Sequence, residues 1–183
     1  MGTPRAERFR VVSVLDEALD VPGKELEQYA STRDFALVDN RYVPGQKPVI
    51  FHVREVPNEL WETFVEGGTT DADRYKRAFM SGLEKVENLP DDAGQLKTWA
   101  PSNKIKSLSV TLLHDEDLKL FSPSERLEIG SVIYRHSFLP RRTAADYPLP
   151  SSLVDPLVRR ARRDAERKEA SASATTSEDS PPQ

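Results

Sequence analysis

Residues 49–53 read Val49-Ile50-Phe51-His52-Val53, and their side chains alternate between a drier and a wetter face. A period of two residues predicts a half-buried β-strand. Pro48 has no N–H to donate, so it fits the start of a strand or an edge position. Upstream, Phe35-Ala36-Leu37-Val38 has the composition of a second strand, and the turn-rich residues 39–46 separate the two. We therefore expect a β-hairpin over residues 35–53.

From residue 57 onward the apolar residues recur at helical spacing instead. Pro57 suits a first helical position, and the helix that it opens ends at Gly67-Gly68. Thr70 caps a second helix, with an aspartate three residues later as a variant of the capping box. The apolar stripe of this second helix is the clearest in the chain, and it consists of Tyr75, Phe79, Leu83 and Val86.

A third long helix begins at Ser122-Pro123-Ser124-Glu125, which combines a capping serine, a proline at the first position and a glutamate at the third. It ends before Pro140, and apolar residues on more than one of its sides predict a central place in the fold. Other segments are less specific. We expect a short helix over residues 24–30 and a loop or insertion over 95–106. Two segments leave alternatives open: residues 9–15 fit a strand or a first helical turn, and residues 107–113 fit a strand or a buried helix.

The C-terminal part of the chain changes in composition. A proline-containing linker precedes a short basic helix over residues 157–168, and residues 170–183 are small and polar. Such a polar stretch cannot bury enough apolar surface to offset the entropy of ordering. We therefore expect an α+β protein with an N-terminal β-hairpin followed by a small helical bundle. The expected boundaries are one compact domain over 1–140, a linker with a basic helical arm over 141–169, and a disordered tail over 170–183.

Composition excludes several classes of site. The chain has 183 residues, of which 37% are hydrophobic, and a net charge of −4, which favours no particular partner. It contains no cysteine, so thiolate zinc sites, iron–sulfur clusters and thiol nucleophiles are excluded. The apolar runs are far shorter than the roughly 20 residues that span a bilayer, and the N-terminus does not resemble a signal peptide. We expect a protein of the cytoplasm that does not enter a membrane.

Candidate chemistry is sparse. His114-Asp115-Glu116-Asp117 is the densest group of potential ligands, but acids also gather at helix N-termini for electrostatic reasons, and that explanation is favoured. His52 and His136 are isolated in the sequence, and we interpret both as boundary residues. The chain lacks the Gly-x-Ser-x-Gly and glycine-rich phosphate-binding patterns. We expect no catalytic, metal-binding or cofactor-binding residues, and no enzymatic activity.

Two groups of residues are candidates for binding a partner. Trp61 and Phe64 lie one helical turn apart; such a pair more often belongs to a core, and the alternative is a docking surface. The second group is in the basic helix, where residues 141–168 carry eight basic and four acidic side chains. Because i, i+4 pairs compensate part of this charge, a solvated helix is favoured, a protein-docking arm comes second and a nucleic-acid contact third. The candidate residues of this arm are Leu157, Arg159, Arg160, Arg162 and Arg163.

The order of motifs resembles that of a known family. The strand segment Lys47–Leu60 leads into a helix, the acidic turn and Leu-Phe-Ser step lie within His114–Ser122, and the last helix ends in Arg135–Leu139. Over residues 35–140 this arrangement resembles the tail assembly chaperones of long-tailed bacteriophages and prophages. That family often pairs a strand of the form Phe-x-Val-Arg-x-Leu with a helical body, and near its end it carries an aspartate-rich turn, a short Leu-Phe-Ser step and a final helix.

The resemblance implies a non-enzymatic assembly chaperone or adaptor without a cofactor. Its partner would be another protein: the tape-measure protein or a tail or neck structural protein. The alternative is a structural virion component, a connector or tail-completion subunit whose C-terminal arm contacts neighbouring subunits. A nucleic-acid-associated regulator ranks third. The expected location is the host cytoplasm, with the virion as the alternative, and the chain itself leaves open whether it forms a homo-oligomer.

Overall fold

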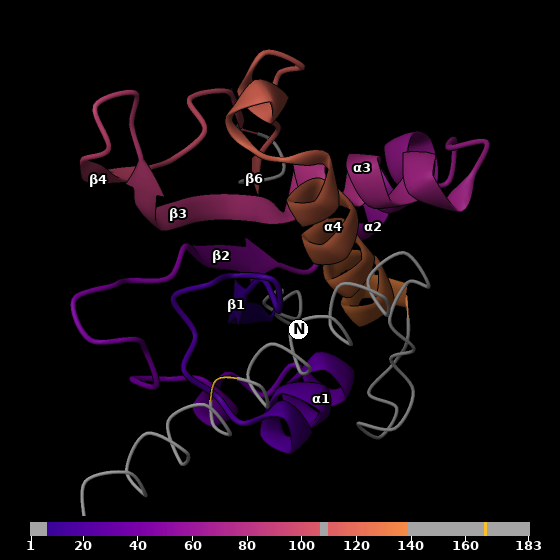
Figure 1. Ribbon diagram of the computed structural model, residues 1–183. Helices are drawn as coiled ribbons and strands as arrows, with labels where there is room; N and C mark the ends of the chain where they lie inside the picture. Colours follow the sequence, from indigo (N-terminus) through magenta and orange to yellow (C-terminus); the bar gives the residue numbers. More distant parts are fainter. Residues whose placement is uncertain (1–6, 107–109, 139–166, 168–183) are drawn as a thin grey trace, which may run out of the picture. The chain divides into compact units, whose positions relative to one another are not determined.

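The computed structural model describes residues 7–106, 110–138 and 167. It confirms the α+β class: an antiparallel sheet packs against helices (Figure 1). The chain divides into two units, Met1–Leu149 and Pro150–Gln183, and Arg167 is the described residue of the second. The first unit contains, in chain order, β1 (Arg8–Val12), α1 (Gly23–Thr32), η1 (Phe35–Leu37), β2 (Ile50–Arg54), α2 (Asn58–Leu60), η2 (Trp61–Val65), α3 (Asp71–Gly82), β3 (Leu83–Pro90), β4 (Leu96–Trp99), β5 (Lys104–Ile105), β6 (Val110–Thr111), η3 (Asp117–Leu120) and α4 (Pro123–Phe138).

The main sheet has the order β1-β2-β3-β4, with every neighbouring pair antiparallel. The expected strand at β2 is confirmed, but its predicted hairpin partner is wrong. Phe51 lies opposite Val11 of β1 and Val86 of β3. Residues 35–37 form a 3-10 helix because the side chain of Asp34 caps it by accepting a hydrogen bond from the N–H of Ala36 at 3.1 Å. Of the two alternatives for residues 9–15, the strand is the one that forms.

The predicted helical stripe from Tyr75 to Val86 is also wrong in its second half. The helix α3 ends at Gly82, and Leu83 and Val86 belong to β3. In β3 the buried residues recur every third position, because the register with β4 shifts between Val86 and Leu89. A Cβ on Gly82 would lie 2.5 Å from Ile133 Cγ2, so glycine is needed where α3 passes directly into the strand.

Residues 95–106 contain β4 and β5, so the expected loop or insertion is wrong as well. Here Trp99 lies opposite Val86, and its ring contacts that of Phe121 with the centroids 5.6 Å apart. The short strand β6 lies in the segment 107–113, whose first three residues are outside the described ones.

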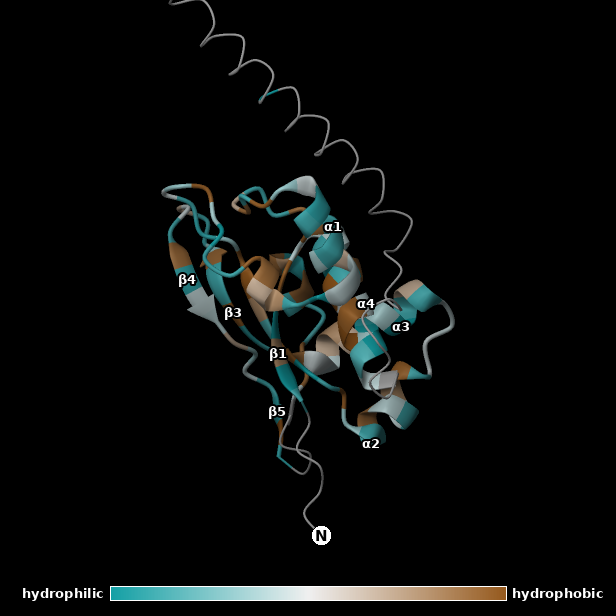
Figure 2. Ribbon diagram, turned by 90° about the horizontal axis from the view of Figure 1, so that it is seen from below, coloured by the Kyte–Doolittle hydropathy of each residue, from teal (hydrophilic) through white to brown (hydrophobic). Residues whose placement is uncertain are grey.

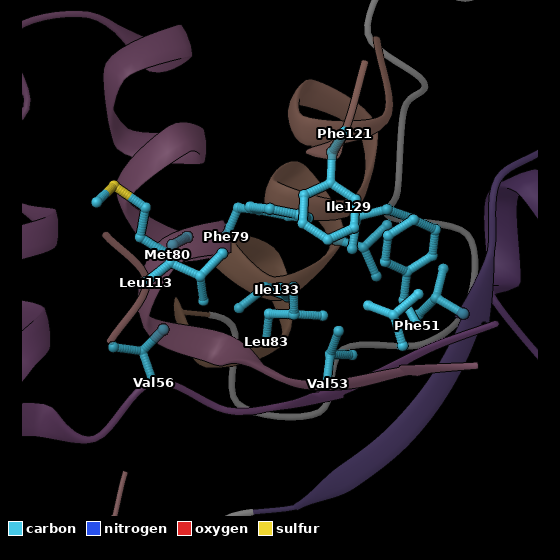
Figure 3. Packing of buried hydrophobic residues seen from close by; sticks show 14 of the residues in the cluster. Phe51, Val53, Val56, Phe79, Met80, Leu83, Leu113, Phe121, Ile129 and Ile133 are labelled. Carbon is cyan, nitrogen blue, oxygen red and sulfur yellow. The ribbon is translucent and has the colours of Figure 1, made fainter. Parts of the chain in front are cut away.

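The core fills the space between the sheet and the helices α3 and α4. Figure 3 shows Phe51, Phe79 and Phe121 gathered with Ile129 and Ile133, and the ring centroids of Phe79 and Phe121 are 5.3 Å apart. In Figure 2 the hydrophobic colour concentrates where helices meet the sheet, whereas the outer side of α1 is hydrophilic. The predicted central position of α4 is confirmed, since Ile129 and Ile133 are fully buried.

Two features fix how the helices begin and pack. At the start of α4 the Ser122 hydroxyl accepts from the N–H of Glu125, whose carboxylate in turn accepts from the N–H of Ser122 at 2.8 Å, so the predicted capping box is confirmed. The Thr70 cap of α3 is confirmed in the same way. Between these helices, a Cβ on Gly130 would lie 2.2 Å from the carbonyl oxygen of Tyr75. The backbones of α3 and α4 therefore approach closely at Gly130.

Candidate protein-binding site

The candidate residues Trp61 and Phe64 lie in η2, which is a π-helix. The N–H of Glu66 donates to the carbonyl of Trp61 at 2.9 Å, one residue beyond the spacing of an α-helix. Both aromatic side chains are half-buried, so neither a purely internal nor a purely exposed interpretation describes them. Single π-helical turns are rare and frequently mark functional sites. This turn is therefore the first place to look for a binding surface.

The inner side of η2 is held by aromatic contacts. The ring centroids of Trp61 and Tyr134 are 4.7 Å apart, and Tyr75 meets Tyr134 edge-on at 5.4 Å. These contacts join η2 to both α3 and α4. Burial raises the pKa of the Tyr134 hydroxyl above its ordinary value, and the nearby carboxylate of Glu66 raises it further.

The side chain of Arg77 contacts the C-terminal end of the π-helix at Phe64. Its Nη1 donates to the carbonyl oxygen of Phe64 at 2.8 Å, and its guanidinium carbon lies 5.3 Å from the centre of the Phe64 ring. The next turn is tight, because a Cβ on Gly68 would lie 2.9 Å from the backbone nitrogen of Arg74. The guanidinium of Arg77 is thus engaged by the carbonyl oxygen and the ring of Phe64.

Three exposed acids follow one another from α2 through η2 to its cap residue. Glu59, Glu62 and Glu66 are exposed, and none of them forms an ion pair with any residue that the structure describes. We call these three residues the acidic face. Two cations of α3 are engaged elsewhere: Arg77 at Phe64, and Arg74 with Asp71 at 3.3 Å. The acidic face therefore carries three carboxylates, spaced i, i+3 and i+7, that form no ion pair within the described part of the chain.

Sequence reasoning missed a polar cluster that is buried around Glu128. The Glu128 carboxylate is fully buried and accepts from Arg33 Nη1 at 2.7 Å, from the Ser13 hydroxyl at 2.6 Å and from the N–H of Val14 at 2.9 Å. Arg33 is itself 2% exposed at its side chain. Next to it, the hydroxyl of Tyr29 accepts from the N–H of Val12 and donates to its carbonyl oxygen.

This cluster joins α1 and the end of β1 to α4. Arg33 follows α1 in the left-handed conformation, with φ of 54°, and Ser13 directly follows β1. The residues are enclosed, so the cluster acts as an internal link between elements far apart in the sequence. The sequence feature that could have revealed this cluster is the position of Glu128 between Leu127 and Ile129, in a helix that was expected to be central.

The acid and histidine residues considered from the sequence have local partners. Asp117 accepts from the N–H of His114 at 2.9 Å, and Lys76 pairs with Asp115, which agrees with the electrostatic explanation of this turn. In the part of the chain that the structure describes, no three histidine or carboxylate side chains are grouped as a metal site would require. His52 Nε2 lies 3.0 Å from the Glu87 carboxylate, and burial, with Lys85 nearby, lowers the pKa of His52.

The arm residues Leu157, Arg159, Arg160, Arg162 and Arg163 lie outside the described residues, as do the predicted boundaries of the linker and the tail. Searches of protein-family models, of curated proteins and of solved structures found no match to this chain. Among the described helices, none combines the length and the apolar character needed to cross a membrane.

Proposed function

We propose that this chain is a non-enzymatic assembly chaperone or adaptor of a bacteriophage or prophage tail, and that it binds its structural partner at the acidic face. The observation that carries the proposal is the segment from α2 through the π-helical turn η2 to its cap residue, where Glu59, Glu62 and Glu66 are exposed and form no ion pair with a residue that the structure describes. The partner is a protein segment with complementary positive charge. The tape-measure protein and a tail or neck subunit are the proposed partners.

The contacts that hold η2 against its neighbouring helices support a role in binding. The rings of Trp61 and Phe64 and the guanidinium of Arg77 hold the π-helical turn in place against α3 and α4. A binding surface held on rigid elements loses less entropy when it associates.

The test is co-purification of the full chain with the tape-measure and tail-tube proteins of its own genome. We expect a soluble complex with one of them, and its loss on Glu59→Lys, Glu62→Lys and Glu66→Lys together. In the matched control, lysine replaces three exposed acidic residues elsewhere, Glu17, Glu27 and Asp92, and the complex should remain intact. Absence of any complex would refute the proposal. Retention of the chain in finished particles would favour the structural virion subunit instead.

A further inference from the structure

We propose that the outer edge of β4 binds an extended, acidic segment of another protein, which joins the main sheet as an additional strand. This surface is separate from the acidic face and has the opposite charge. It is a second binding site that does not depend on the proposed function. The backbone groups at this edge, the anchoring of the strand and the charge around it support the site.

One edge of β4 has no strand beside it. β4 is the last strand of the main sheet, and among the described residues β3 is its only strand partner (Figure 1). Lys97 lies opposite Leu89 of β3, and the carbonyl oxygen of Gln95 accepts at 2.9 Å from the N–H of the residue that follows β3. Alternate residues of an antiparallel strand bond to the same neighbour, so the N–H and carbonyl groups of Leu96 and Thr98 point to the other edge. No hydrogen bond joins these groups to another element of the described chain.

The opposite edge of the sheet is covered by the protein itself. In β1, the N–H and the carbonyl oxygen of Val12 bond to the hydroxyl of Tyr29, at 2.8 and 2.9 Å. No described side chain bonds in this way to the backbone of Leu96 or Thr98. An uncovered strand edge is a template on which another chain can pair. The free edge of β4 is therefore the place where the sheet can accept a further strand.

The strand β4 is anchored on one of its faces and open on the other. Side chains alternate along a strand, so Lys97 and Trp99 share one face while Leu96 and Thr98 share the other. The Trp99 ring contacts Phe121 of the core, with the ring centroids 5.6 Å apart. By contrast, Leu96 is 50% exposed. The anchored ring holds the strand in position before a partner arrives, which reduces the entropy that binding costs.

The charge around this edge favours an acidic occupant. Residues 93–106 carry Lys97, Lys104 and Lys106 and no acidic residue. All three lysines are exposed, and none of them forms an ion pair with a residue that the structure describes. Figure 2 shows the chain running on from β4 to β5, which contains Lys104. Lysine at a strand edge disfavours pairing with a strand that lacks complementary charge, and carboxylates supply that charge.

A second copy of β4 is a poorer occupant than an acidic strand. Pairing two copies edge to edge would bring their lysines together, and like charges on neighbouring strands destabilise a sheet. In an added strand, the residue opposite Lys97 shares its face, whereas the residues opposite Leu96 and Thr98 lie on the other face. The occupant therefore alternates acidic residues near Lys97 with apolar residues near Leu96. Backbone hydrogen bonds give such a contact its affinity, and this alternation gives it specificity.

The experiment is an NMR titration of the isotope-labelled full chain with synthetic peptides, followed through the backbone amide signals. The probe is a peptide of about seven residues, the length of an ordinary strand, in which glutamate alternates with valine and both ends are blocked. We expect it to shift the amide signals of residues 95–99. Two matched peptides should not shift them. One carries lysine in place of glutamate, and the other is the acidic peptide with methyl groups on its backbone nitrogens, which removes its donors.

Two variants of the chain test the backbone and the charge separately. Thr98→Pro removes an N–H that points to the free edge, and proline is accepted at such positions of edge strands, so the affinity for the acidic peptide should fall about fivefold or more. Lys97→Glu with Lys104→Glu should weaken binding about threefold or more, and this variant should gain affinity for the lysine peptide, which a misfolded chain would not do. The matched control makes the same change of charge on α1 and α3, with Lys24→Glu and Lys76→Glu, and should bind the acidic peptide as the wild type does.

Three results would overturn the inference. The first is an acidic peptide that leaves the signals of residues 95–99 unchanged. The second is an equal response to the N-methylated peptide, because the contact would then depend on charge without strand pairing. The third is a Thr98→Pro chain with the affinity of the wild type. The variant with Glu59→Lys, Glu62→Lys and Glu66→Lys should bind the peptide normally, so failure at the acidic face and failure at β4 are distinguishable.

Discussion

The ion pair between Arg33 and Glu128 provides the sharpest prediction about stability. Glu128→Ala removes the carboxylate that accepts from three donors: the Arg33 guanidinium, the Ser13 hydroxyl and the N–H of Val14. Removing one partner of a buried pair leaves an uncompensated charge and costs about 3–5 kcal/mol. Since single domains are stable by about 5–15 kcal/mol, this loss is a large share of the total.

Urea unfolding followed by circular dichroism measures the effect. With a denaturant slope of about 1–3 kcal/mol/M, a loss of about 3 kcal/mol moves the midpoint by at least about 1 M. The control is Glu116→Ala, because Glu116 pairs with Lys119 at 2.6 Å on the surface, with both side chains more than 70% exposed. Removing that pair should cost about 1 kcal/mol or less.

The double replacement Arg33→Met and Glu128→Leu tests whether stability requires the ion pair itself or only a filled site without an unpaired charge. Apolar residues of similar volume often replace a buried ion pair without loss, so the double variant should recover much of the stability that Glu128→Ala loses. A Glu128→Ala variant that is destabilised by less than about 1 kcal/mol would refute the reasoning, because the pair would then contribute no more than an exposed one.

Three further predictions concern packing and pH. Gly130→Ala should destabilise the fold by about 1–3 kcal/mol in urea unfolding, because the new Cβ would overlap the Tyr75 carbonyl; unchanged stability would contradict the close approach of α3 and α4. Burial raises the pKa of Tyr29 to about 12. In the unfolded chain it is about 10, so stability should be full below about pH 10 and fall as pH rises toward 12, and Tyr29→Phe should remove this alkaline loss from the urea midpoint. Burial also lowers the pKa of His136, which stacks on Phe9 with ring centroids 4.1 Å apart. The stabilising contribution of the neutral His136 side chain is therefore full above about pH 6.5 and is lost as the pH falls through its folded pKa. We expect His136→Phe to remove this part of the acid-induced fall in the urea midpoint. A His136→Phe variant whose urea midpoint falls with acid as much as that of the wild type would contradict this role of His136.

Local signals in the sequence predicted local structure well. The capping box at Ser122 and Glu125, the cap at Thr70 and the alternation around Phe51 each describe interactions between residues a few positions apart. Such patterns are readable because the interacting groups are neighbours in the sequence. The strand, the helix starts and the α+β class could therefore be predicted.

The errors involved partners far away in the sequence. The pairing of β1 with β2 joins Val11 to Phe51, and only the folded sheet brings these residues together. In β3 an irregular register placed Leu83, Val86 and Leu89 at a spacing of three, which imitates a helix.

The candidate site was predictable only in part. Trp61 and Phe64 were recognised as an aromatic pair, but the π-helical turn that contains them depends on Arg77, 13 residues beyond Phe64. Glu128 looked like an ordinary helical residue, because its partners Ser13 and Arg33 come from more than 90 residues upstream. Neither feature leaves a local sequence pattern.

Hydrogen–deuterium exchange on the complex with the tape-measure protein tests the central claim most directly. The account predicts that binding slows exchange at residues 58–66, which carry the acidic face, and leaves exchange of the exposed side of α1 unchanged. The Glu59→Lys, Glu62→Lys and Glu66→Lys variant should show no such protection. Protection that appears elsewhere, with residues 58–66 exchanging as fast as in the free chain, would contradict the account.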